Sequence, residues 1–459
     1  MTTRSNTTWT ELTIGAEAEV SRLCVADDLF VFAHASGNLN PMHLPGDNDG
    51  SAQAVAPSMW VGALISAVLG NELPGPGTLY KRQTLNFLDR ARTGDLLTAH
   101  VRLVDKGTEA DRLARFETWV TREDGKRIVE GEAEVVAPDR SASCETSDLP
   151  GLMLRRHVHF DRLLEQAAPL PPIPTAVVAP EEENALGGAL LAARHTLIDP
   201  ILIGSVEQIA RVARMLDVDI SSHEIIDIAD HDKAAARAVA LVHEGRVRAI
   251  MKGHLHTDQL LRHVVKRDGG LRSSRRLSHV FVMDVPGLDH LLLVTDAAIN
   301  IAPDLETKVD IIQNAIDLAI AVGLEQPKVG VLSAVETVNP RMPSTLDAAI
   351  LSKMAERGQI VGGIVDGPLA MDNAVDLAAA RTKGIKSSVA GRADVLVVPN
   401  LEAGNILAKE LTFVAEAEAA GLVIGARCPV MLTSRADDDR ARLASCAVAV
   451  LYEAWAGAR

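Results

Sequence analysis

The run Leu291-Leu292-Leu293-Val294-Thr295-Asp296-Ala297-Ala298-Ile299-Asn300 shows the pattern that decides the fold of most of this chain. Four apolar residues without alternation lead directly into a polar turn. A short continuous apolar run is typical of a strand buried on both faces. Similar runs recur along the sequence at Thr175–Val178, Pro200–Ile203, Ala249–Met251, His279–Val282, Val329–Leu332, Ile364–Val365, Val395–Val398 and Pro429–Leu432.

Helix-patterned stretches separate most of these runs, at Glu207–Met215, Leu305–Val322, Thr345–Ala355 and Gly404–Ala420. Apolar strands that alternate with helices predict an α/β fold, with a buried parallel sheet covered by helices on both faces. Ligands of such sheets bind beyond the carboxyl ends of the strands. The loops that follow the apolar runs are therefore the candidate functional loops.

The first part of the chain has a different pattern. Pro57–Leu69 is rich in Ala, Leu and Ile and begins with a proline, which suits the first turn of a helix. Strand-like runs follow, and the last one alternates as a half-buried antiparallel strand does. One helix followed by antiparallel strands predicts an α+β layer. The runs are Tyr80–Phe87, Leu96–Val104, Arg115–Thr121 and Lys126–Val136.

A polar stretch and a proline-rich stretch, between residues 138 and 174, mark connecting chain. The predicted domains are residues 10–138 and 175–459, with residues 139–174 as the linker. The length of 459 residues fits two or three compact bodies.

The composition excludes several classes of partner. With a net charge of −15 and only 3% aromatic residues, the chain has neither a broad basic surface nor stacking platforms, so no nucleic acid partner is predicted. No apolar run approaches the roughly 18 residues of a membrane span, and residues 1–11 hold no apolar segment of a secretion signal. Four scattered cysteines without CxxC spacing indicate reduced thiols, and a cytoplasmic protein is expected.

The segment Lys252-Gly253-His254-Leu255-His256-Thr257, followed by Arg262, is one candidate loop. A strand end followed by Lys, Gly, a hydroxyl group and Arg fits an anion site at a helix start, and it equally fits a turn with solvated charges. The two histidines form HxH, but no carboxylate or second His cluster at ligand spacing accompanies them. No metal site is predicted.

Polar residues follow the other apolar runs as well. Any single loop of this kind could be a helix cap, because Asp, Asn, Ser and Thr favour caps whatever the function. Five such loops at strand ends make a stronger case for a binding cleft. The loops begin at Thr295, Ser333, Asp366, Pro399 and Thr433.

These segments together resemble the phosphate acetyl/butyryltransferase family over roughly residues 160–459. The resemblance is carried by Leu277-Ser278-His279-Val280, Leu293–Pro303, Val331–Glu336, Ile364–Ala370, Val397–Asn405 and Leu432-Thr433-Ser434-Arg435-Ala436-Asp437. It implies an architecture like that of isocitrate/isopropylmalate dehydrogenase, with two α/β subdomains and the active site in the cleft between them.

The resemblance further implies transfer of an acetyl or butyryl group between coenzyme A and phosphate, both taken as substrates, without a permanently bound cofactor, by a homo-oligomer. It implies that Arg435 binds phosphate or the oxyanion, that Ser434 contacts the carbonyl oxygen or the thiol, and that a nearby Asp is the base. Asp437 is the first choice among Asp437, Asp438 and Asp439; this cluster could instead be an acidic helix N-terminus. Substrate-binding roles fall on His256, Thr257, Arg262, Ser333, Asn400, Gly404 and Asn405.

The segment Ser36-Gly37-Asn38-Leu39-Asn40-Pro41-Met42-His43 resembles the signature of MaoC-like hydratases, whose hot-dog fold wraps a sheet around one helix. Those enzymes hydrate enoyl-CoA with an Asp/His pair. Here His43 is present, but Asn38 occupies the Asp position, and an amide cannot take a proton from water. The hydratase activity is therefore in doubt, and the segment could also be only a turn rich in Gly, Asn and Pro.

The domain order resembles bifunctional enoyl-CoA hydratase/phosphate acetyltransferases. Two alternatives stay open: a non-catalytic acyl-CoA-binding regulatory protein, and a cofactor-dependent dehydrogenase of the same architecture. No G-x-G-x-x-G or P-loop lies at a strand–helix junction to support the second.

Overall fold

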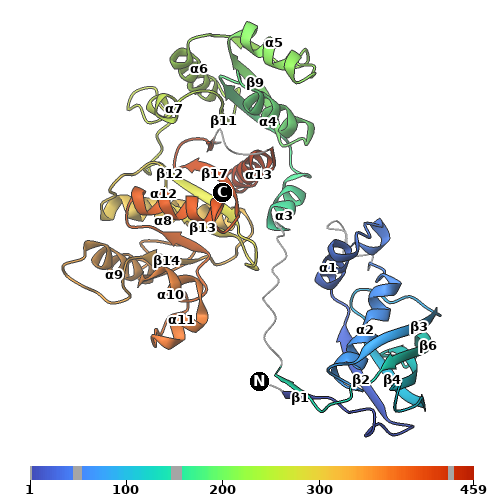
Figure 1. The fold of residues 1–459 in the computed structure, drawn as a ribbon. Helices are drawn as coiled ribbons and strands as arrows, with labels where there is room; N and C mark the ends of the chain where they lie inside the picture. The colour runs from blue at the N-terminus through green and yellow to red at the C-terminus, as the bar shows by residue number, and fades with distance from the viewer. Residues whose placement is uncertain (1–2, 45–53, 146–157, 433–438, 459) are drawn as a thin grey trace. The chain divides into compact units, whose positions relative to one another are not determined.

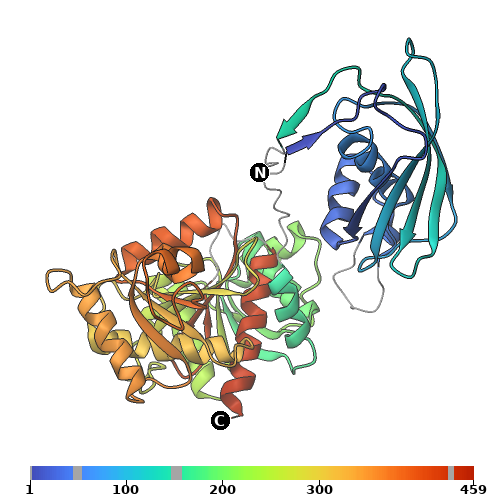
Figure 2. The same cartoon turned by 90° about the horizontal axis from the view of Figure 1, so that it is seen from below.

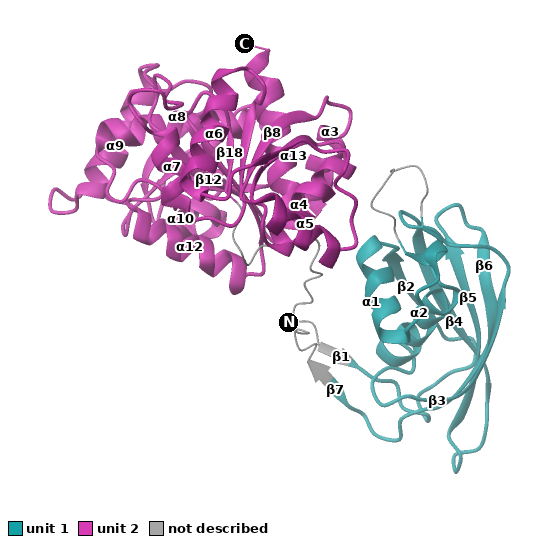
Figure 3. Cartoon of the chain, turned by 90° about the horizontal axis from the view of Figure 1, so that it is seen from above, with its two compact units in different colours: residues 1–154 teal, residues 155–459 magenta. Residues whose placement is uncertain are grey.

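The computed structural model describes residues 3–44, 54–145, 158–432 and 439–458, and it forms two compact units, residues 1–154 and 155–459 (Figure 3). Each unit has its own sheet and buried core. Within the described ranges, none of the helices combines the length and the apolar character that crossing a membrane requires.

The first unit is an antiparallel sheet packed on helix α2 (Figures 1 and 2). The strand order is β2-β4-β5-β6-β3, and every neighbouring pair is antiparallel. Alternate residues of β4 face the core, where Leu97 and Val101 join Ile65 and Val68 of α2. This is the predicted hot-dog arrangement. Its elements are β1 (Thr3–Ser5), β2 (Glu17–Leu23), α1 (Ala26–Ser36), η1 (Pro41–His43), α2 (Ser58–Asn71), β3 (Leu79–Phe87), β4 (Leu96–Lys106), β5 (Leu113–Arg122), β6 (Arg127–Val136) and β7 (Ser143–Glu145).

The second unit is built on one 11-stranded sheet of order β10-β9-β8-β11-β18-β17-β12-β13-β16-β14-β15. All of the apolar runs noted in its sequence form strands. The strands are β8 (Ile173–Val178), β9 (Ile198–Gly204), β10 (Ile225–Asp227), β11 (Ala249–Lys252), β12 (Ser278–Asp284), β13 (Leu292–Thr295), β14 (Lys328–Leu332), β15 (Ile364–Leu369), β16 (Val395–Val397), β17 (Glu418–Ile424) and β18 (Val430–Met431).

The prediction of a parallel sheet is right at both ends of this sheet and wrong in the middle. Strands β10, β9, β8, β11 and β18 are parallel to one another, as are β13, β16, β14 and β15. Between the two sets, β18, β17, β12 and β13 pair antiparallel. The connections from β12 to β13 and from β17 to β18 are too short for a parallel crossover, so these strands form hairpins. The two parallel sets therefore run in opposite directions.

The predicted helix Gly404–Ala420 is also wrong in its second half. Helix α12 (Leu401–Phe413) ends early, and β17 begins at Glu418. The segment between them includes Glu416 at a φ of 57°, outside the helical region of the backbone. Helix formers such as Ala419 and Ala420 lie in a strand here because pairing along the whole of β12 outweighs their weak intrinsic preference.

Helices cover the two faces of the sheet differently. One face packs on α3, α4, α5, α8, α9 and α13 through a single large hydrophobic cluster. The other face carries two separate clusters, one with α6 and α7 and one with α10, α11 and α12. The bounds are α3 (Val158–Ala167), α4 (Glu183–Arg194), α5 (Val206–Met215), α6 (His231–His243), α7 (Thr257–Val264), α8 (Leu305–Ala321), α9 (Pro343–Glu356), α10 (Met371–Val375), α11 (Leu377–Thr382) and α13 (Asp439–Gly457).

Candidate functional site

The loop between β11 and α7 carries the first group of candidate residues. His256 is the N-cap of α7, its backbone N–H donates to Gln259, and Thr257 is the first helical residue. Arg262, in the last turn, lies 3.7 Å from Asp232 with its side chain 62% exposed. An exposed guanidinium this far from its partner keeps most of its capacity to bind an anion.

Two imidazole–carboxylate contacts lie beside this loop, one made by the loop itself through His254 and one between α6 and the chain that follows β8. The Nε2 atom of His231, the first residue of α6, lies 2.8 Å from Glu181 Oε2, and the Nδ1 atom of His254 lies against the Glu182 carboxylate. The other oxygen of Glu181 accepts the backbone N–H of Ser205, which caps α5. No local sequence pattern indicates Glu181, Glu182 or His231 as site residues. They follow different strands, and only the fold brings them together. Among the described residues, no group of three or more such side chains could hold a metal ion.

The turn after β13 and the start of α12 form a second group. Asp296 is 2% exposed, and its carboxylate accepts the backbone N–H groups of Ala298, Ile299 and Asn300. Burial raises the pKa of Asp296, while these hydrogen bonds oppose the rise. Asp296 thus orders the turn from within.

The start of α12 packs closely on that turn. Asn400 caps the helix by accepting the Ala403 N–H at 2.9 Å, and Asn405 donates to the carbonyl of Ala297 at 3.4 Å. A Cβ at Gly404 would lie 2.9 Å from the Asp296 carbonyl oxygen, so only glycine allows this approach. Two of the predicted binding residues, Gly404 and Asn405, therefore contact the turn after β13, and Asn400 caps the helix that carries them.

Ser333 follows β14, which belongs to the same parallel set as β13 and β16. Its hydroxyl lies 2.8 Å from the hydroxyl of Ser344, and its N–H donates to the Leu369 carbonyl. These contacts join β14, α9 and β15. Since β14 and β11 belong to oppositely directed sets, Ser333 and the His256 loop follow strand ends that point to opposite edges of the sheet.

Ser434, Arg435, Asp437 and Asp438 lie outside the described residues. Asp439 is the first residue of α13, as the alternative of an acidic helix start expects for that residue. Strand β18 pairs with β17 only through Met431 and Val430, opposite Leu422 and Val423. Strand β18 is thus a two-residue strand that lies inside the sheet, between β11 and β17. Lys252, 8% exposed, ends the neighbouring strand β11.

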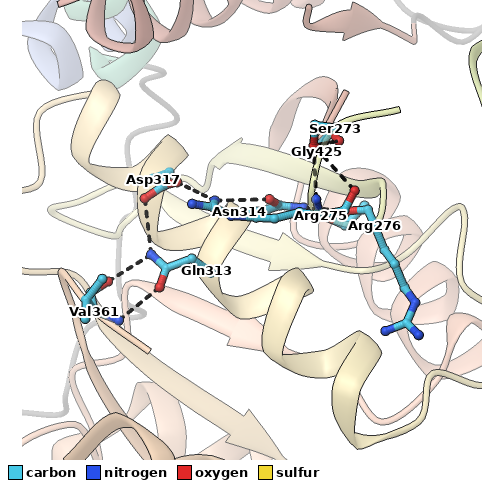
Figure 4. Close-up of polar contacts among 9 residues, drawn as sticks. Ser273, Arg275, Arg276, Gln313, Asn314, Asp317, Val361 and Gly425 are labelled. Atoms are coloured by element: carbon cyan, nitrogen blue, oxygen red, sulfur yellow. Dashed lines mark hydrogen bonds and ion pairs between the residues drawn. The ribbon is translucent and has the colours of Figure 1, made fainter. Parts of the chain in front are cut away.

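A polar network fixes the entry to β12 (Figure 4). Arg275 Nη1 donates to Asp317 Oδ2 at 2.5 Å, and the Asn314 amide donates to the Arg276 carbonyl and to the Ser278 hydroxyl. Ser273 donates to the Gly425 carbonyl at 2.6 Å. The network joins α8, the start of β12 and the β17–β18 turn into one rigid base.

In the first unit, Asn38 and His43 are both half-buried. The Asn38 side-chain oxygen accepts the backbone N–H of Asn40 at 3.2 Å. His43 Nδ1 lies 2.7 Å from the Val55 carbonyl, and because a carbonyl only accepts, Nδ1 carries the proton. In the neutral ring, the lone pair then lies on Nε2.

Comparison with known proteins adds to this geometry. Residues 231–450 match the family model "Phosphate acetyl/butaryl transferase". A phosphate acetyltransferase of Rhizobium meliloti is 58% identical over 295 residues, which are 64% of this chain and 93% of the relative. A phosphate butyryltransferase of Clostridium beijerinckii is 43% identical over 64% of this chain and 98% of its own.

Solved structures match both parts of the chain. A branched-chain phosphotransacylase from Enterococcus faecalis V583 is 30% identical, with a TM-score of 0.53, over 61% of this chain and 99% of its own. The R-hydratase PhaJ1 from Pseudomonas aeruginosa is 35% identical, with a TM-score of 0.32, over 34% of this chain and 100% of its own.

Proposed function

Because the chain belongs to the phosphate acetyl/butyryltransferase family, we propose that it interconverts acyl-CoA plus phosphate with acyl phosphate plus CoA. The observation that carries the proposal is the 58% identity across 93% of a phosphate acetyltransferase. In the direction of CoA attack, a thiolate forms a C–S bond to the acyl carbon, and the C–O bond to phosphate breaks. The acyl group is acetyl or butyryl.

The proposed roles follow the chemistry of that step. Asp437 takes the thiol proton, Arg435 stabilises phosphate or the oxyanion, and Ser434 contacts the carbonyl oxygen or the thiol. Arg262 and the start of α7 bind an anionic part of the substrates. Their support is the order of residues in the sequence and the exposure of Arg262.

The finer architecture is part of the same proposal. Two helix groups on one sheet face, each with its own hydrophobic cluster, support two subdomains with a cleft between them, as in isocitrate/isopropylmalate dehydrogenases. We place the protein in the cytoplasm as a homo-oligomer that uses CoA and phosphate as substrates and holds no resident cofactor.

The test is phosphate-dependent release of CoA thiol from acetyl-CoA and from butyryl-CoA. Turnover with either substrate supports the proposal, and the ratio of kcat/KM values gives the acyl preference. Absence of turnover with both rejects it. If the protein then still binds acetyl-CoA, it is a regulatory acyl-CoA-binding protein instead.

For the first unit we propose an acyl-CoA-binding module with little or no hydratase activity. The orientation of His43 supports one acid/base group, whereas hydration needs a base for water and an acid for the α-carbon. Loss of absorbance with crotonyl-CoA measures the activity directly. A rapid wild-type rate would reject this reading of Asn38.

A further inference from the structure

The register of the large sheet brings the ends of oppositely directed strands to one level. Met251 of β11 pairs with Met431 of β18, which pairs with Leu422 of β17. Leu422 pairs with Val280 of β12, and Val280 pairs with Thr295, the last residue of β13. Strand β11 ends one residue beyond this row and β13 ends in it, although the two strands point to opposite edges. The loops that follow them therefore leave the sheet at the same level.

The two loops are separated across the sheet by the strands between them. In the strand order β11-β18-β17-β12-β13, this separation is about 19 Å, at roughly 4.8 Å for each strand spacing. The loop after β11 leads to Arg262 and the start of α7, to which we assign an anionic part of the substrates. A ligand that reaches both loops must be elongated, as coenzyme A is and phosphate is not. The turn after β13 is therefore placed to contact a part of coenzyme A remote from α7.

The side chain of Asn300, in the turn after β13, is held in one orientation. Its Nδ2 atom donates to the Leu277 carbonyl at 2.9 Å and to Asp296 Oδ2 at 2.5 Å. An amide nitrogen carries two hydrogens, and both are used here. The backbone N–H of Asn300 donates to the same carboxylate oxygen at 3.1 Å. Because the amide cannot turn without breaking these bonds, the position of its oxygen, Oδ1, is fixed.

The fixed oxygen is a hydrogen-bond acceptor that the protein does not use itself. Asn300 is half-buried, and among the described residues no donor bonds to its Oδ1 atom. An amide oxygen can only accept a hydrogen bond, so its ligand must supply a donor. Of the proposed reactants, coenzyme A carries amide N–H groups on its pantetheine arm, whereas phosphate presents mainly acceptor oxygens. Oδ1 of Asn300 therefore suits coenzyme A and not phosphate.

We propose that Asn300 is a binding residue for coenzyme A, whose Oδ1 accepts a hydrogen bond from an amide N–H of the pantetheine arm. The inference rests on the proposed acyl transfer and names the part of the substrate that this turn contacts. The turn fixes the amide before the ligand arrives, so little ordering is needed on binding. A residue with a structural role alone would not distinguish coenzyme A from phosphate.

The first test measures KM for acetyl-CoA and for phosphate, and the melting temperature, for Asn300→Ala and Asn300→Ser in the full chain. Both variants lose the amide oxygen, and the serine hydroxyl can keep one of the two donated bonds. We expect KM for acetyl-CoA to rise about tenfold in each, as for one lost hydrogen bond, with KM for phosphate within twofold of wild type.

The matched control is Asn314→Ala in the same unit. Asn314 is 1% exposed, and its Nδ2 atom also donates to two acceptors, the Arg276 carbonyl and the Ser278 hydroxyl. The change should therefore lower the melting temperature while both KM values stay within about twofold of wild type.

The second test changes the ligand. Acetyl thioesters of pantetheine and of pantetheine methylated at both amide nitrogens are compared as substrates. Methylation should lower kcat/KM at least about fivefold more in wild type than in Asn300→Ala, because only wild type has the acceptor to lose.

The proposal is overturned by equal losses on methylation, by KM values for acetyl-CoA within twofold of wild type in both variants, by an equal rise in KM for phosphate, or by failure of both variants to fold. An inactive wild-type protein would instead reject the proposed function. Calorimetric titration with coenzyme A would then still show whether Asn300→Ala weakens its binding.

Discussion

An amide at position 38 leaves the first unit with one titratable side chain, His43, in the segment that resembles the hydratase signature. The amide of Asn38 can orient a water molecule but cannot take its proton. Asn38 is half-buried, and its side-chain oxygen orders the loop by accepting the backbone N–H of Asn40. The chemistry at this site thus depends on one side-chain group.

Asn38→Asp should therefore raise the hydration rate of crotonyl-CoA by at least about tenfold, because a carboxylate can act as the general base. The decrease in crotonyl-CoA absorbance measures the rate. Asn38→Asp combined with His43→Ala should return to the background rate. An unchanged rate in the single variant would mean that the unit lacks more than a base.

Arg435→Ala should lower phosphate-dependent turnover at least about 100-fold, since a lost cation leaves transition-state charge uncompensated. Release of CoA thiol from acetyl-CoA measures it. Arg427→Ala is the control, because Arg427 is exposed and its described contact is made by its backbone. Near wild-type rates for Arg435→Ala would contradict the assigned role.

The pKa of His279 predicts a pH dependence of stability. Burial lowers the folded-state pKa to about 4, below the ordinary 6.5, so the unfolded chain binds the additional proton. The part of the unfolding free energy that depends on a neutral His279 is complete above pH 6.5, and it is lost as the pH falls from 6.5 toward 4. Between pH 7.5 and pH 5, wild type should lose about 2 kcal/mol more unfolding free energy than His279→Gln. Urea titrations at both pH values measure the difference, and parallel losses would refute it.

At the scale of elements, the base under β12 depends on a few buried amides. Asn314 is 1% exposed and donates to both Arg276 and Ser278. Asn314→Ala should cost about 1–3 kcal/mol of unfolding free energy, because two acceptors lose their partner. Urea unfolding followed by circular dichroism measures the cost. The exposed Glu325→Ala should stay within about 0.5 kcal/mol of wild type, and a similar small change for Asn314 would contradict the network's importance.

Elements were predictable where local pattern and tertiary packing agree. The apolar run at Leu291–Val294 and the alternation of Lys126–Val136 gave strands that the structure contains. Strand β17 was missed because Ala419 and Ala420 favour a helix by themselves, and only pairing with β12 makes them a strand. Site residues show the same limit. The orientation of the Asn300 amide depends on the carbonyl of Leu277, 23 residues earlier in the chain, and no local pattern records that contact.

At the scale of the whole molecule, each unit has a separate core. Within the described residues, the buried clusters of residues 1–154 and of residues 155–459 share no member. Residues 155–459 alone should therefore keep kcat for phosphate-dependent CoA release within about twofold of the full chain. Steady-state assays of both proteins test this. A truncated protein that folds but has lost turnover would show that the first unit supports the transferase.

Helix α13 has a consequence for how the second unit is made. Its buried residues, among them Leu443, Cys446 and Val450, lie in the cluster that α3, α4 and α8 also form on one face of the sheet (Figure 1). On the ribosome, every strand of that sheet emerges before α13 does. The first unit can fold as soon as its own strands are out, whereas the second exposes an apolar face until synthesis has passed residue 457. Chaperone contact during translation is therefore expected to concentrate on the nascent second unit.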